Sequence, residues 1–296
     1  MSSSASFEPM PATAAASIAN YHLSGPDVKM HLAIEIPQAE HRIKLVNAWR
    51  IPPGSRILEI GCGQGTTTAV LAEAVGPTGH VDAVDPGRPD YGSPWTLAQA
   101  QEHLSKSAIG DRISWHFADP IDFLAANADK TWDYVIFVHC IWYFDSPATL
   151  TKMLGALKGR AASLLVAEYA LKATEKNALP HVLASVARAT LEAHNKGSQA
   201  NIRCLSSPGA ITDAANENAW TLDGEIFLVP EAGLLDGHWE TGTVKSPDFL
   251  KEIEDKVDDS KVRALLRSAR DGVLGILETM EVKKSWTMDV WAATFH

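Results

Sequence analysis

The sequence predicts an α/β protein built on a doubly wound, mostly parallel β-sheet with helical cap segments. Between residues 56 and 169, short apolar runs alternate five times with segments of helical pattern. These runs are apolar throughout instead of at every second position, which indicates strands buried on both faces by connecting helices. A glycine-rich turn follows the first run, and ligands of such sheets bind beyond the carboxyl ends of the strands.

The individual elements follow from the local pattern. The first 18 residues or so are Ser, Ala and Pro with few large apolar groups, so we expect them to be disordered. Apolar residues at helical spacing predict a helix over residues 41–49, which "PPG" then ends. The alternating part follows, with strands at 56–60, 80–85, 112–117, 132–140 and 162–169 and helices at 66–76, 96–110 and from 147.

The regular alternation of predicted strands and helices ends after residue 169. A long amphipathic helix is expected over residues 175–195, with a kink at Pro180, and a second helix over 207–220. A strand at 221–229 and a last strand at 285–295 bring the predicted sheet to seven strands. Two further helices are predicted between them, over residues 247–257 and 261–280.

Composition limits the classes of partner. The 296 residues are 46% hydrophobic, enough for a large buried core, and the net charge is −10. Such an acidic chain is a poor ligand for nucleic acid or for anionic membranes. Three scattered cysteines form neither a disulfide framework nor a zinc pattern. The first basic residue is Lys29, unlike the start of a secretory signal, so we expect a cytoplasmic protein.

The loop after the first strand reads "EIGCGQGT". Its third glycine comes one residue too early for the dinucleotide fingerprint, and the lysine of a phosphate-binding loop is missing. What remains is the acid Glu59, a bare-backbone turn and the N-terminus of a helix. Helix N-termini attract carboxylates, and an acid pairs with an ammonium group. The loop is therefore suited to the two charged groups of an amino acid.

This acid–x–G–x–G–x–G run resembles motif I of the class I S-adenosylmethionine-dependent methyltransferases. The resemblance extends over residues 50–169 and weakly through the C-terminal strands. It implies S-adenosylmethionine as cofactor, with Asp85 on the ribose hydroxyls and Asp119 near the adenine amino group. The cofactor-binding residues implied in this way are Glu59, Gly61, Cys62, Gly63, Gly65, Thr66, Asp85, Pro86, Asp119, Pro120 and His139.

Chemistry is expected at the end of the fourth strand, in "FVHCIWYF". Methyl transfer is a direct displacement, so much of its catalysis is alignment of the reacting groups. His139 is placed to act as a general base or to contact the acceptor, the alternative being a histidine that only holds the turn. No pair of carboxylates has a spacing typical of a metal site. The residues predicted to bind the acceptor are Tyr21, His22, Trp142, Tyr143, Glu168, Tyr169, His181 and Arg203.

The predicted organisation has four parts. Residues 1–49 form an N-terminal tail and cap helices, 50–171 the cofactor-binding core, 172–207 a substrate-cap insertion and 208–296 the completion of the sheet. The predicted activity is methyl transfer to oxygen, nitrogen or sulfur of a small-molecule acceptor, as in secondary metabolism. Two alternatives are a non-methylating reaction on the same fold and a scaffold protein that only binds the cofactor.

Overall fold

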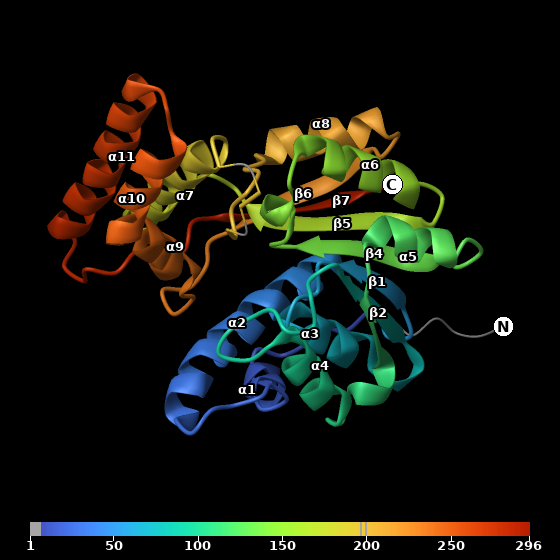
Figure 1. The fold of residues 1–296 in the computed structure, drawn as a ribbon. Helices are drawn as coiled ribbons and strands as arrows, with labels where there is room; N and C mark the ends of the chain where they lie inside the picture. The colour runs from blue at the N-terminus through green and yellow to red at the C-terminus, as the bar shows by residue number, and fades with distance from the viewer. Residues whose placement is uncertain (1–6, 196, 199) are drawn as a thin grey trace.

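The structure, a computed structural model, describes residues 7–195, 197–198 and 200–296. Its centre is a seven-stranded sheet in the order β3-β2-β1-β4-β5-β7-β6, in which β7 runs antiparallel to both of its neighbours (Figure 1). This confirms the predicted doubly wound, mostly parallel sheet. The strands are β1 (Arg56–Ile60), β2 (His80–Asp85), β3 (Ile113–Phe117), β4 (Trp132–Val138), β5 (Ala161–Tyr169), β6 (Leu222–Leu228) and β7 (Val290–Phe295).

Helices cover both faces of the sheet and form a separate group at one end of it (Figure 1). Their bounds are α1 (Ala14–Ala19), α2 (Val28–Trp49), α3 (Thr66–Val75), α4 (Leu97–Ser105), α5 (Pro120–Ala126), α6 (Pro147–Leu157), α7 (Leu179–Glu192), α8 (Pro208–Glu217), α9 (Asp236–Lys245), α10 (Pro247–Lys256) and α11 (Ser260–Thr279). No helix of the described ranges is both long and apolar enough to cross a membrane.

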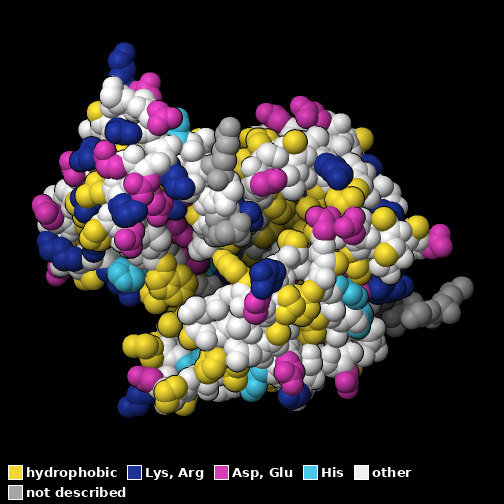
Figure 2. Space-filling model, in the orientation of Figure 1, with side chains coloured by type: hydrophobic (Ala, Val, Ile, Leu, Met, Phe, Trp, Pro, Cys, Tyr) yellow, Lys and Arg dark blue, Asp and Glu magenta, His cyan; other side chains and the backbone are white. Residues whose placement is uncertain are grey.

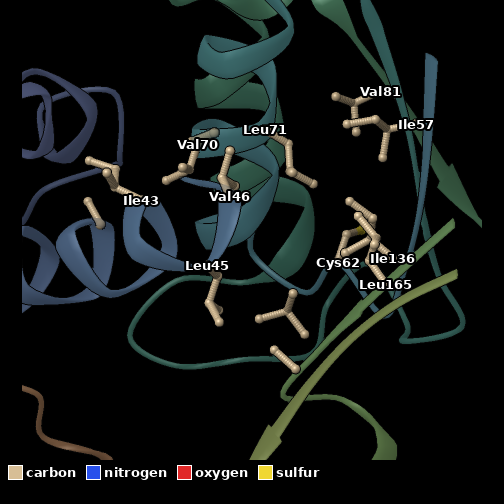
Figure 3. Close-up of a cluster of buried hydrophobic side chains, with 14 of the residues drawn as sticks. Ile43, Leu45, Val46, Ile57, Cys62, Val70, Leu71, Val81, Ile136 and Leu165 are labelled. Carbon is tan, nitrogen blue, oxygen red and sulfur yellow. The ribbon is translucent and has the colours of Figure 1, made fainter. Parts of the chain in front are cut away.

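Successive residues of the central strands pack into different cores. Ile57 of β1 belongs to the core shared with α2 and α3, whereas its neighbour Leu58 belongs to the core under α5, α6 and α8. Figure 3 shows the first of these cores, where side chains of α2 and α3, such as Val46 and Leu71, gather opposite the sheet. Burial on both faces explains why the strands read as continuous apolar runs. Each fully buried Leu, Ile or Val contributes about 1.5–3 kcal/mol.

The helical cap has its own core. Side chains of α7 pack with those of α9, α10 and α11, among them Leu191, Phe249 and Leu266, all of them fully buried. The cap therefore draws on residues 179–192 and 236–279, whereas the sequence analysis assigned 172–207 to it and the later residues to completion of the sheet. The reason is topological, because the chain leaves the sheet after β6, builds α9–α11 and returns as β7.

The N-terminal segment differs from the prediction. Residues 1–6 lie outside the described ranges, but residues 14–19 form α1, in which Ala15 and Ile18 are buried. Asn47 of α2 ties this segment down, because its side chain accepts a hydrogen bond from Met10 N (2.8 Å) and donates one to Met10 O (2.9 Å). Helix α2 itself begins at Val28, thirteen residues before the predicted start, with Asp27 accepting from Met30 N. The expectation of disorder to residue 18 was therefore wrong for the described part.

Asp82 is a buried acid in β2 that bonds to side chains outside its own strand. It is 2% exposed and accepts hydrogen bonds from Lys130 Nζ (2.8 Å), Trp132 Nε1 (2.8 Å) and His116 Nε2 (3.1 Å). Burial alone would raise the pKa of Asp82, but these donors outweigh it and hold the pKa well below its usual range. The carboxylate ties β2 to β3 and β4.

We expect Asp82→Asn to lower the free energy of unfolding by about 3 kcal/mol at pH 7, because it leaves buried donors without their anion. A carboxyl whose pKa falls on folding stabilises the fold above its unfolded pKa, near 4, and loses that contribution as the pH drops. The difference between the two proteins should therefore shrink below about pH 4. Urea unfolding across pH measures it, with the exposed Asp122→Asn as a control. Equal stability of both variants would contradict the network.

Candidate active site

The glycine loop connects β1 to α3. Gly65 caps α3 with φ +94°, and a Cβ there would lie 2.6 Å from Leu104 Cδ1 and from the Trp115 ring, so no larger residue fits. Gly63 also has positive φ (+52°), but a Cβ built on it meets nothing within 4 Å. One glycine is thus required by internal packing, and the other leaves open space where a ligand can approach the main chain.

Glu59 supports the loop from inside the protein. Its side chain is 2% exposed, and Thr68 Oγ1 donates a hydrogen bond to Oε2 at 2.5 Å. Burial raises the pKa of Glu59 to about 7, against the lowering effect of the Thr68 hydroxyl. Cys62 is likewise buried in the core, where burial raises the pKa of its thiol, so the thiolate form is disfavoured. Both residues therefore support the loop from its buried side.

The two acids predicted to hold the adenosine lie at the same edge of the sheet. Asp85 Oδ2 accepts from Gly63 N (2.8 Å), and Oδ1 accepts from Gly87 N (2.7 Å). The main chain joins them, because Ala118 N donates to Asp85 O (3.1 Å) and the exposed Asp119 follows directly. Asp119 Oδ1 accepts from Ile121 N (2.8 Å) and caps α5. Carboxylate oxygens accept more than one hydrogen bond, so both acids keep capacity for a ligand.

A cavity of about 880 Å³ opens beside this loop. Its walls come from α2, the glycine loop, the carboxyl ends of β4 and β5, and α9, and Figure 2 shows the surface indented between the helical cap and the N-terminal helices. The lining includes aromatic side chains and several carboxylates. The aromatic residues are Trp95, Trp142, Tyr143, Tyr169 and Trp239, and the acidic residues are Asp27, Glu35, Glu168, Asp236 and Glu240.

His139 lies in this wall, one residue beyond β4. Its backbone has φ +50°, which is uncommon for a residue with a side chain, and its N–H donates to Ala167 O (2.9 Å). The ring stacks on that of Tyr169 (centroids 4.4 Å apart), and its edge meets the edge of the His41 ring (centroids 5.2 Å apart). Its Nε2 is 3.0 Å from His41 Nε2, and its Nδ1 is 3.5 Å from Glu168 Oε1. Backbone strain of this kind is concentrated at functional sites.

Glu168 is fixed by the main chain. Its Oε2 accepts from Ile141 N (3.1 Å) and its Oε1 from Tyr169 N (3.0 Å), and the residue is 1% exposed. Next to it, burial and the charge of Asp236 raise the pKa of Tyr169, so its hydroxyl keeps its proton. The site therefore presents an imidazole, a fixed carboxylate and a phenol to the same cavity.

Comparison with known proteins agrees with this geometry. A family described as "Methyltransferase domain" matches residues 57–160. Two methyltransferases of Diaporthe leptostromiformis, phomM' and phomM, are 27% and 26% identical and align with 87% of this chain and 83% of their own. The solved structure of a cyclopropane-fatty-acyl-phospholipid synthase-like protein from Lactobacillus casei ATCC 334 superposes with a TM-score of 0.84, at 28% identity over 96% of this chain and 99% of that one.

Together, the matched domain, the two relatives and the solved structure support a class I S-adenosylmethionine-dependent methyltransferase. A more distant structure, the cyclopropane synthase MmaA2 from Mycobacterium tuberculosis, shares the fold with a TM-score of 0.52 at 14% identity, covering 96% of this chain and 95% of that one. The cofactor of this methyltransferase is S-adenosylmethionine. Its sulfonium group supplies an electrophilic methyl group when it is bound.

The residues around the glycine loop fit this cofactor, and the clearest sign is a residue that the sequence analysis missed. Arg42 of α2 lines the cavity although it is only 8% exposed. Its Nη1 donates to the side chain of Gln38, and its Nε has no hydrogen-bond partner among the described residues. A buried guanidinium with spare donors is suited to a carboxylate, such as that of the methionine part. An earlier start of α2 in the prediction would have placed Arg42 on the face of Gln38.

The predicted acceptor residues fall into two groups. Trp142, Tyr143, Glu168 and Tyr169 line the cavity together with His139 and Thr66.

The other group does not line it. Tyr21 packs half-buried against the core, and His22 lies beside it at the end of α1. His181 is fully buried, accepts from Met288 N (3.0 Å) and supports Tyr169 edge-on. The main-chain N–H of Arg203 donates to Trp142 O (2.8 Å). Pro86 is exposed beside Asp85, and Pro120 is buried in the first turn of α5.

Proposed function

We propose that this methyltransferase transfers the methyl group to oxygen, nitrogen or sulfur of a small-molecule acceptor, a specialised metabolite, held in the cavity between the sheet and the cap. The observation that carries the proposal is the position of His139 in the wall of that cavity, with Glu168 beside it. The cavity volume, about 880 Å³, is within the range of small-molecule sites, and it must hold part of the cofactor as well. Its aromatic walls suit an organic acceptor.

In this proposal, the chain's own residues orient the acceptor and remove its proton. Trp142, Tyr143 and Tyr169 provide apolar surfaces on which an organic ring can stack. His139 takes the proton that the nucleophilic atom loses, and Glu168 stabilises the resulting imidazolium from 3.5 Å. The cap helix α9 contributes Asp236, Trp239 and Glu240 to the cavity wall. Each of these tasks needs an enclosed acceptor, which disfavours a macromolecular substrate.

The test is a transfer assay with S-adenosylmethionine carrying a labelled methyl group. Acceptor panels of phenols, alcohols, amines and thiols are compared with vesicles of unsaturated phosphatidylglycerol and with total protein and RNA. We expect label only in small molecules, on a heteroatom, as located by NMR of the product. Label on the double bonds of the lipid, or on protein or RNA alone, would overturn the proposal. Omission of the protein provides the background for every panel.

A further inference from the structure

We propose that His41 is a positioning residue of this methyltransferase, which donates a hydrogen bond from Nε2 to the Nε2 of His139 and so fixes the tautomer of that ring. The inference rests on the proposed role of His139. The two nitrogens are 3.0 Å apart although their residues are 98 positions apart in the chain. His41 comes from α2, and His139 follows β4, so the contact links the N-terminal helices to the sheet.

The direction of this hydrogen bond follows from the third partner. When two imidazole nitrogens meet at hydrogen-bond distance, one carries the proton and the other accepts it. Glu168 Oε1 lies 3.5 Å from His139 Nδ1, and this nitrogen has no hydrogen-bond partner among the described residues. A nearby carboxylate favours a proton on the ring nitrogen closest to it. The proton of neutral His139 is therefore assigned to Nδ1, which leaves Nε2 bare. His41 Nε2 is then the donor.

His41 is suited to this task because it stays neutral and is buried beside His139. It is 4% exposed, and its ring meets that of His139 edge to edge, with an angle of 28° between the ring planes. Burial lowers the pKa of His41 well below its usual value, and the charges of Arg42 and Lys44 add to this. A neutral imidazole carries a single N–H, so a proton on Nε2 leaves Nδ1 bare.

Other titratable groups near the pair support the same assignment or do not oppose it. From β5, Glu168 faces Nδ1 of His139, and Tyr169 stacks on its ring with a hydroxyl whose pKa is raised by burial. From α7, His181 lies behind Tyr169, and burial lowers its pKa to about 4, so it is neutral at pH 7. No second anion among these groups competes with Glu168 for the His139 proton.

The tautomer of His139 before the acceptor binds decides whether its Nε2 can act as a base. A general base needs a ring nitrogen without a proton. Glu168 favours a proton on Nδ1 and His41 donates to Nε2, so together they favour the tautomer in which Nε2 has no proton. The acceptor's O–H, N–H or S–H then replaces His41 at Nε2, and its proton moves to that nitrogen while Nδ1 keeps its own. Without His41 the ring can also adopt the tautomer with a proton on Nε2, which cannot act as a base there.

The experiment reads the tautomer directly. Two-bond ¹⁵N–¹H spectra of the histidine rings, recorded at pH 7.5 with S-adenosylhomocysteine bound, distinguish a proton on Nδ1 from one on Nε2, and His139→Asn assigns the signals. We expect His139 to be protonated on Nδ1 in the normal protein and in His41→Gln, whose amide N–H reaches about as far as Nε2. In His41→Phe, which keeps a ring but no donor, we expect a mixture of tautomers.

Turnover provides the second readout. His41→Phe should lower kcat about five- to tenfold, the value of one neutral hydrogen bond, with the KM of S-adenosylmethionine unchanged, and His41→Gln should recover most of it. A normal protein with its proton on Nε2 of His139, or the Nδ1 tautomer retained in His41→Phe, overturns the inference whether or not the variants fold well. The tautomer needs no acceptor, so normal turnover in His139→Asn would reject the role of His139 and leave the pairing standing.

Discussion

His139→Asn is expected to lower turnover by about 10² to 10⁴-fold while leaving the affinity for S-adenosylmethionine nearly intact. The side chain lines the cavity proposed for the acceptor, whereas the acids Asp85 and Asp119 do not line it. Asparagine keeps polarity and approximate size but cannot take up a proton near neutral pH. The loss should therefore appear in kcat, measured with saturating cofactor and acceptor.

A pH profile separates proton removal from simple orientation of the acceptor. If His139 removes a proton, the curves of kcat against pH differ in shape between the normal protein and the variant, whereas loss of a group that only orients the acceptor lowers kcat by the same factor at every pH. The matched control is His103→Asn, because His103 is an exposed histidine of α4 that does not line the cavity. Full activity of His139→Asn, or an equal loss in His103→Asn, would remove His139 from the mechanism.

The sheet could be predicted because its signal is local. Each central strand is buried on both faces, so residues such as Ile57 and Leu58 are both apolar although they enter different cores. The glycines and Asp85 could be placed for a related reason, since strand ends in a parallel sheet meet at one edge. The strand order and the antiparallel direction of β7 were not predicted and come from the structure alone.

The cap could not be predicted in the same way. Helix α9 carries Asp236 and Glu240 into the cavity, yet its sequence "DGHWETGTVK" has two glycines and β-branched residues and lacks a clear helical stripe. It is stabilised by packing on α7 and by Thr241, which is buried and bonds back to Gly237 O (2.8 Å). Tertiary contacts outweigh the weak propensity here. Burial raises the pKa of Glu240 to about 7, with Asp236 adding to the effect.

Single polar residues were the hardest to interpret, because their partners are distant in sequence. Asp82 resembles any acid in a strand, and its role depends on Lys130 and Trp132, about fifty positions away. His41 and Arg42 occupy helical positions that read as ordinary polar residues until α2 is placed over the glycine loop. The predicted Tyr21 and His22 are close in sequence to that helix, but the turn before α2 directs them to the core.

Asp85→Ala is expected to weaken the binding of S-adenosylmethionine by about tenfold to a hundredfold for each ribose hydrogen bond lost, since bonds to a charged group are worth about 1.5–3 kcal/mol. Part of the loss has a second origin. The carboxylate also accepts from Gly63 N and Gly87 N, so the glycine loop loses a support that shapes it. We therefore expect a small decrease in the thermal stability of the cofactor-free protein besides the larger decrease in affinity.

Titration calorimetry with S-adenosylmethionine and with its demethylated product measures this effect, and thermal unfolding without ligand measures the contribution of the loop. Asp90→Ala is the matched control, because Asp90 lies five residues further on, is exposed and pairs only with Arg88 among the described residues. Its affinity should equal that of the normal protein. Asp85→Asn should be intermediate, since the amide keeps one acceptor oxygen but turns a donor toward a main-chain N–H. If Asp85→Ala binds S-adenosylmethionine as tightly as Asp90→Ala does, other residues hold the ribose, and the assignment of Asp85, at the end of β2, to the cofactor is wrong.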